Sequence, residues 1–73
     1  MLINVAIQGE GVRPTEVDEG MSLGDLRIVK GYSETLEFRL AGEVIDNTFV
    51  FDYDSVDEGA YLIGTKDAKG GNL

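Results

Sequence analysis

The apolar residues of this chain recur at every second position in several segments, and at helical spacing in only one. The first segment, residues 2–8 (LINVAIQ), places Ile3, Val5 and Ile7 on one side of an extended backbone. Period-two alternation with β-branched residues is typical of a strand that is buried on one face. We therefore expect the fold to be organised around a sheet.

A second strand is predicted directly after the first. Gly9-Glu10-Gly11 suits a tight turn because glycine tolerates positive φ. Residues 12–20 (VRPTEVDEG) follow, and Pro14 lacks the N–H group that a central strand needs for its ladder. The pattern predicts an N-terminal β-hairpin whose second strand lies at a sheet edge or carries a bulge.

Residues 21–33 (MSLGDLRIVKGYS) change to helical periodicity. Ser22 is expected to be the N-cap, with Asp25 three residues later as the acidic member of a capping box. Gly31 is expected to end the helix in the left-handed conformation after two to three turns. The buried face is predicted to consist of Leu23, Leu26 and, at the next turn, Val29.

Three further segments return to extended patterns. Residues 35–42 (TLEFRLAG) alternate, residues 43–46 (EVID) form a short strand, and the apolar run of residues 60–64 (AYLIG) predicts a central strand buried on more than one side. Residues 47–59 between them are expected to be an irregular crossover. The side chains predicted to face inward are Leu36, Phe38 and Leu40 in the strand, with Phe49 and either Phe51 or Val50 in the crossover.

This order of elements predicts an α+β roll of one domain, with one short helix packed across a mixed sheet of four to five strands. The last strand can lie beside the first in parallel, because the rest of the chain is long enough to serve as the crossover. We expect the domain to span residues 1–65. Residues 66–73 are polar and glycine-rich, and we expect them to form an extended, mobile tail.

The absence of cysteine and histidine restricts the chemistry of the chain. It removes disulfides, thiolate metal sites, the thiol nucleophile and the commonest general base, so we expect neither an independent enzyme nor a cofactor. The acidic segment 52–58 (DYDSVDE) does not fit a calcium loop, because Val56 and Asp57 stand where an oxygen ligand and a glycine are needed. We expect a solvated turn there and no metal site.

The formal net charge of -8, from 14 acidic and six basic residues, makes nucleic acids and anionic membranes poor partners. The acidity indicates either a basic partner or simple solubility, and the scatter of the acids favours solubility. No apolar run approaches the roughly 20 residues of a membrane helix, and the first residues lack the features of a signal peptide. These features favour a cytoplasmic or particle-associated protein.

Several short motifs resemble the β-grasp superfamily, which includes ubiquitin and the small sulfur carriers of thiamin and molybdopterin synthesis. Residues 38–64 (FRLAGEVIDNTFVFDYDSVDEGAYLIG) resemble the ubiquitin segment in which a strand ends at Ala-Gly, here Ala41-Gly42, and a Tyr-containing loop precedes the last strand. Tyr53 matches that tyrosine if a one-residue shift is allowed. The motifs SLGDLR, RLAGEVID and VDEGAYLI resemble the sulfur carriers. Both groups end in Gly-Gly, which matches Gly70-Gly71 here.

The resemblance implies a C-terminal handle at Gly70 and Gly71. In these families an adenylating enzyme activates the terminal carboxylate, which then becomes a thiocarboxylate, a thioester or an isopeptide, and glycine lets the tail enter a narrow active site. Asn72-Leu73 follow the glycines, so a processing peptidase would first have to cut after Gly71. Arg39 occupies the position of ubiquitin's central docking isoleucine, and Arg39 with Glu37 is the expected partner-docking pair.

Three functions remain open at this point. The first is a ubiquitin-like modifier or sulfur carrier that acts through Gly71 after trimming. The second is a non-catalytic interaction or structural module, such as a subunit of a larger assembly or of a virus particle. The third is an acidic inhibitor that imitates nucleic acid. In every case we expect the binding partner to be a protein.

Overall fold

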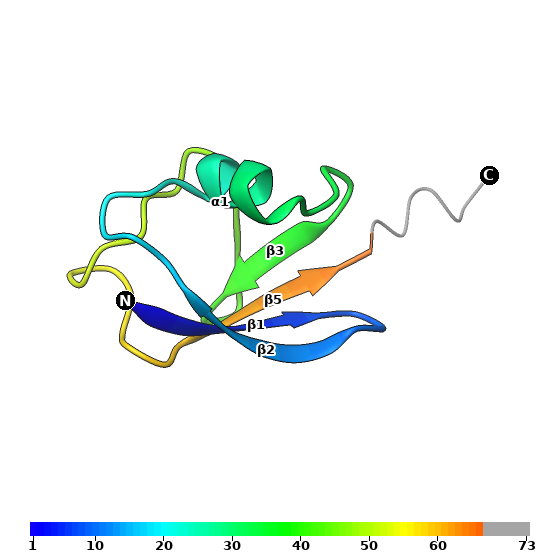
Figure 1. The fold of residues 1–73 in the computed structure, drawn as a ribbon, viewed down its shortest axis with the longest axis horizontal. Coiled ribbons are helices and arrows are strands. Elements are labelled where there is room, and N and C mark those ends of the chain that lie inside the picture. Colours follow the sequence, from blue (N-terminus) through cyan, green and yellow to red (C-terminus); the bar gives the residue numbers. More distant parts are fainter. Residues whose placement is uncertain (67–73) are drawn as a thin grey trace.

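Residues 1–66 form a five-stranded mixed sheet with one helix across it in the computed structural model, which describes this part of the chain (Figure 1). The strand order is β2-β1-β5-β3-β4; β1 and β5 are parallel, and the other neighbours are antiparallel. The α+β class, the single helix and the parallel pairing of the first and last strands are therefore confirmed. The elements are β1 (Leu2–Ile7), β2 (Gly11–Glu16), α1 (Leu23–Lys30), β3 (Glu37–Leu40), β4 (Glu43–Ile45) and β5 (Tyr61–Thr65).

The N-terminal hairpin forms as predicted, but its second strand ends at Glu16 instead of continuing to residue 20, because β1 begins at Leu2, which pairs with Glu16. Ile3, Val5 and Ile7 of β1 are buried under α1, while the alternate residues face the other side of the sheet. β2 lies at the edge of the sheet, where Pro14 needs no second strand partner. The turn between the two strands contacts the end of β5, because the Gln8 side-chain oxygen accepts a hydrogen bond from the Lys66 N–H at 2.9 Å.

Helix α1 has the predicted caps. The Ser22 hydroxyl accepts a hydrogen bond from the Asp25 N–H at 3.1 Å, the Asp25 carboxylate accepts one from the Ser22 N–H, and Gly31 ends the helix at a φ of 72°. The prediction for Val29 is wrong, because its side chain is 65% exposed. At about 100° per residue, Val29 lies about 120° around the helix from Leu23, so it turns away from the sheet.

The core between α1 and the sheet contains the predicted residues of β3, and it decides between the two alternatives in the crossover. Phe51 is fully buried, whereas Val50 is exposed. Phe49 packs edge-to-face against Phe51, with ring centroids 5.3 Å apart. The most deeply buried side chains are Ile3, Val17, Leu23, Leu26, Phe38, Phe51 and Leu62.

Strand β5 is central, as predicted, but only one of its faces is buried. Leu62 points into the core, while Tyr61 and Ile63 are exposed on the opposite side. A strand is buried on both faces only where other elements cover both sides of the sheet. The single helix of residues 1–66 covers one side, so the apolar run of β5 reaches solvent on the other (Figure 1). This helix is too short to cross a membrane.

Candidate protein-docking face

The side of the sheet opposite α1 carries a row of neighbouring side chains that crosses all five strands. On this side Ala6 of β1 pairs with Val12 of β2 and with Ile63 of β5. Arg39 of β3 pairs with Ile63 and with Val44 of β4. Tyr61 lies two residues before Ile63 on the same side. We call the surface made by Val12, Ala6, Ile63, Tyr61, Arg39 and Val44 the open face.

The open face is rich in exposed apolar side chains. Val44 and Tyr61 are each 56% exposed, Val12 is 52% exposed and Ile63 is 46% exposed. Single exposed apolar residues are normal on a protein surface, but a contiguous group of them marks an interaction site. The continuity of the row across the strands therefore makes this face the best candidate for contact with another protein.

The two residues predicted to dock a partner lie on this face and form an ion pair with each other. The Arg39 guanidinium lies 2.9 Å from the Glu37 carboxylate, and both side chains are about half exposed. An exposed pair of this kind contributes at most about 1 kcal/mol to stability, but it neutralises the charge of Arg39 locally. The open face is therefore apolar and electrically balanced, and it suits an apolar surface on the partner.

Four apolar residues of this face, Val12, Val44, Tyr61 and Ile63, do not appear among the site residues predicted from sequence. The unbroken apolar run AYLIG predicts a strand that is buried on more than one side, so the sequence did not indicate an exposed face there. A usable signal was present elsewhere in the chain. Since only one segment has helical periodicity, only one side of the sheet could be covered by a helix.

A shallow hollow of about 360 Å³ borders the open face. Tyr61 and Ile63 form one wall, and the Ala41-Gly42 turn between β3 and β4 forms another. A hollow of this kind can receive one side chain of a partner, and interfaces place their strongest contacts in such pockets.

The predicted handle, Gly70 and Gly71, lies outside the described residues. Its position along the chain is nevertheless fixed: β5 ends at Thr65, five residues before Gly70. The strand that carries Tyr61 and Ile63 on the open face is thus also the strand that precedes the glycine pair.

Three side chains of residues 1–66 have a shifted pKa. Burial raises the pKa of Tyr32, while burial and then the Glu58 carboxylate raise that of Tyr53. Hydrogen bonds from the hydroxyl and N–H of Thr48 lower the pKa of Asp46. All three shifts move the pKa of the side chain further from neutral pH. Among the same residues, no group of three or more acidic side chains could hold a metal ion.

The chain matches no protein-family model and no curated protein sequence. The observations that bear on its function are therefore the open face, the order of the strands and the residues that follow β5.

Proposed function

We propose that this protein is a ubiquitin-like modifier or sulfur carrier of the β-grasp type. Its open face binds an adenylating enzyme, and Gly71, once exposed by a processing peptidase, carries the reactive carboxylate. The chain itself supplies no catalytic residue in this proposal; it supplies a docking surface and a chemical handle. The observation that carries the proposal is the exposure of Tyr61 and Ile63 on the central strand that precedes Gly70-Gly71.

The sheet topology supports the β-grasp assignment. The last strand lies in the centre of the sheet, parallel to the first, and α1 crosses one face of the sheet. The turn at Ala41-Gly42 joins β3 to β4 with positive φ at both residues, as a two-residue hairpin requires. This is the position at which the resemblance to ubiquitin implies a strand that ends in Ala-Gly.

The position of the glycine pair relative to the open face supports the carrier function. An enzyme that binds the exposed side of β5 already holds the strand from which the chain continues to Gly70. Binding energy from the open face would then raise the effective concentration of the terminal carboxylate at the enzyme's active site. In this proposal the bound enzyme supplies the catalytic groups, and the chain supplies only the terminal carboxylate.

A second candidate function is a non-catalytic β-grasp module that is buried in a larger assembly. The specific observation that favours it is the extent of the apolar row, which reaches from Val12 at one edge of the sheet to Val44 at the other. An assembly subunit would use this whole row as a permanent interface. It would need no trimming of the C-terminal residues.

The mass of the intact protein from its native source tests the choice between the two functions. The carrier function predicts a species that ends at Gly71, with or without sulfur in place of one carboxylate oxygen, or a conjugate through Gly71. If every molecule retains Asn72 and Leu73, the carrier function is wrong and the assembly module is favoured.

The substitution Ile63→Glu tests whether the open face delivers the chain to the processing and activating enzymes. We expect the fraction of protein that ends at or is conjugated through Gly71 to fall at least tenfold, because a carboxylate must then be desolvated at the centre of the interface, at a cost of roughly 2 kcal/mol. Ile28→Glu is the matched control, since Ile28 is 81% exposed on α1. An equal loss in both variants, or no loss in Ile63→Glu, would show that the open face is not the docking surface.

A further inference from the structure

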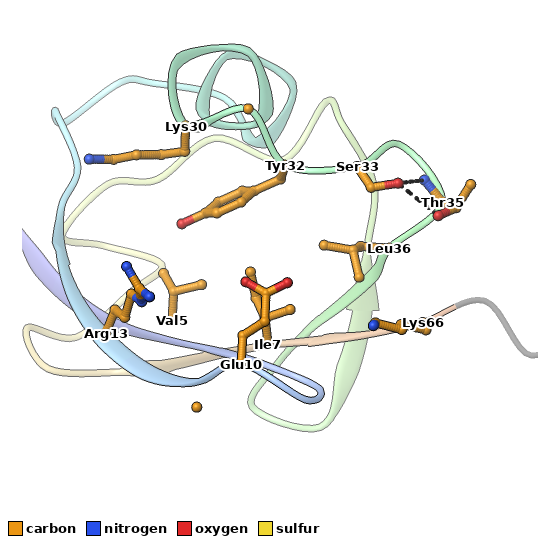
Figure 2. Close-up of a pocket in the computed structure, with 12 residues that line it drawn as sticks. Val5, Ile7, Glu10, Arg13, Lys30, Tyr32, Ser33, Thr35, Leu36 and Lys66 are labelled. Carbon is orange, nitrogen blue, oxygen red and sulfur yellow. Dashed lines mark hydrogen bonds between the residues drawn. The ribbon is translucent and has the colours of Figure 1, made fainter.

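A second surface feature lies on the helix side of the sheet, away from the open face. It is an open cavity of about 690 Å³ between the β1–β2 hairpin, the end of α1 and the segment that leads into β3 (Figure 2). Val5, Ile7 and Leu36 form an apolar part of its wall. The volume is within the range of small-molecule sites, which are commonly apolar clefts with a few polar groups.

The cavity gathers positive charge in a strongly acidic protein. Arg13, Lys30 and Lys66 line it, which is three of the six basic residues of the chain, whereas Glu10 is one of 14 acidic residues. No ion pair within residues 1–66 involves any of the three cations. Three cations around one cavity that have no acidic partner within residues 1–66 indicate an anionic ligand.

The fold determines where these cations stand. Arg13 pairs with Val5 across the hairpin, so it lies on the helix side of β2. Lys30 is the last residue of α1, directly before the left-handed Gly31. The Lys66 backbone is held at the hairpin turn by its bond to Gln8, and its ammonium group lies close to Gly9. The strand β2, the end of α1 and the residue after β5 thus each bring one positive charge to the cavity.

Tyr32 adds a hydrogen-bond donor between two of these cations. Its ring packs against Phe38, with centroids 5.6 Å apart, and reaches into the cavity with the hydroxyl toward the side that carries Arg13 and Lys30 (Figure 2). Burial raises the pKa of this hydroxyl, although Thr15 and the charge of Arg13 oppose the shift. The hydroxyl therefore keeps its proton at neutral pH and can donate a hydrogen bond to an oxyanion.

We propose that this cavity binds a small molecule that carries a phosphate group. Arg13, Lys30 and the Tyr32 hydroxyl bind the phosphate oxygens, Lys66 adds to the attractive field, and the apolar wall contacts the organic part of the ligand. Guanidinium and ammonium groups form charge-assisted hydrogen bonds to phosphate, which are stronger than bonds between neutral groups.

The net charge of the chain restricts the ligand to a small molecule. At physiological salt, charges are screened beyond about 8 Å, so a phosphate group inside the cavity interacts mainly with its lining. A polyanion such as a nucleic acid would extend past the cavity and meet the acidic surface of a protein with a net charge of -8. Glu10 also faces the cavity, and it limits the number of negative charges that the site accepts.

A titration followed by ¹H–¹⁵N NMR spectra of the full chain tests the proposal. The probes are phenyl phosphate, inorganic phosphate and benzoate, added at constant ionic strength. We expect phenyl phosphate to shift the amide resonances of Gly11, Gly31 and Ser33, with a dissociation constant on the order of 1 mM or tighter. Inorganic phosphate should shift the same resonances more weakly, because it lacks a group to contact the apolar wall. Benzoate should bind more weakly than phenyl phosphate.

Two variants with the same chemical change identify the site. Arg13→Gln should weaken phenyl phosphate binding about tenfold, because one charge-assisted contact is lost. Arg39→Gln, which changes an exposed arginine on the opposite face of the sheet, should leave the affinity within about twofold. The proposal is overturned if no saturable shift occurs at the cavity, if benzoate binds as tightly as phenyl phosphate, or if both variants weaken binding equally. None of these outcomes depends on Gly71, so the result is independent of the carrier function.

Discussion

Replacing Gly64 with alanine is expected to lower the free energy of unfolding by about 2 kcal/mol, because the core has no room for one more methyl group beside Phe38. Gly64 pairs with Phe38 across β5 and β3. A Cβ atom at Gly64 would lie 2.7 Å from one ring carbon of Phe38 and 3.2 Å from another. The ring cannot move aside easily, since it is fully buried and is in contact with Tyr32 and the Arg27 guanidinium. Urea unfolding followed by circular dichroism measures the change.

The substitution Phe38→Leu provides the control for this explanation. It removes the ring atoms that the new methyl group would meet, so Gly64→Ala should cost at least about 1 kcal/mol less in the Phe38→Leu protein than in the natural one. A double-mutant cycle with the four proteins gives this difference directly. An equal cost in both backgrounds would mean that the close contact with Phe38 is not the reason for glycine at position 64.

Replacing Arg27 with lysine is expected to lower the free energy of unfolding by about 2 kcal/mol, since lysine cannot reproduce a planar array of donors. The Arg27 guanidinium donates hydrogen bonds to the Asn47 side-chain oxygen at 2.7 Å and to the backbone oxygens of Ser33 and Leu36 at 2.7 and 2.8 Å. It also lies 4.9 Å from the centre of the Phe38 ring. One side chain of α1 thereby holds the segment before β3 and the turn after β4.

Arg39→Lys is the matched control for Arg27→Lys. Within residues 1–66 the Arg39 side chain hydrogen-bonds only to the exposed Glu37 carboxylate, so its replacement should change the free energy of unfolding by less than about 0.5 kcal/mol. Equal effects in the two variants would contradict the role given to the Arg27 donors. Because Ser33 and Leu36 also line the cavity, Arg27→Lys should in addition shift the amide resonances of that segment.

Most elements of the fold could be predicted because their signals are local. The alternation in β1 and β3, the capping box at Ser22 and Asp25, and Gly31 at the helix end each depend on residues a few positions apart. Such patterns reflect the geometry of one strand or one helix, so they can be recognised without knowing what packs against it. The prediction for Val29 was wrong for a local reason too: it lies six residues after Leu23, which places it on a different face of the helix.

The candidate sites could be predicted only in part. Arg39 and Glu37 were expected at a docking surface, and they lie on the open face. The other residues of that face come from the four other strands, so the sequence around Arg39 does not reveal them. The cavity combines Arg13, Lys30 and Lys66, which are separated in the sequence by 17 and 36 positions. No pattern along the chain relates residues so far apart.

By itself, the sequence determined which segments form strands and which forms the helix, the α+β class, and the absence of histidine and cysteine chemistry. The tertiary structure alone decided which side of β5 remains exposed, that a Cβ atom at position 64 would meet the Phe38 ring, and that three cations line one cavity. The physical reason is the range of the forces involved. Backbone geometry and capping act between near neighbours in the chain, whereas burial and electrostatic grouping depend on which segments the sheet brings together.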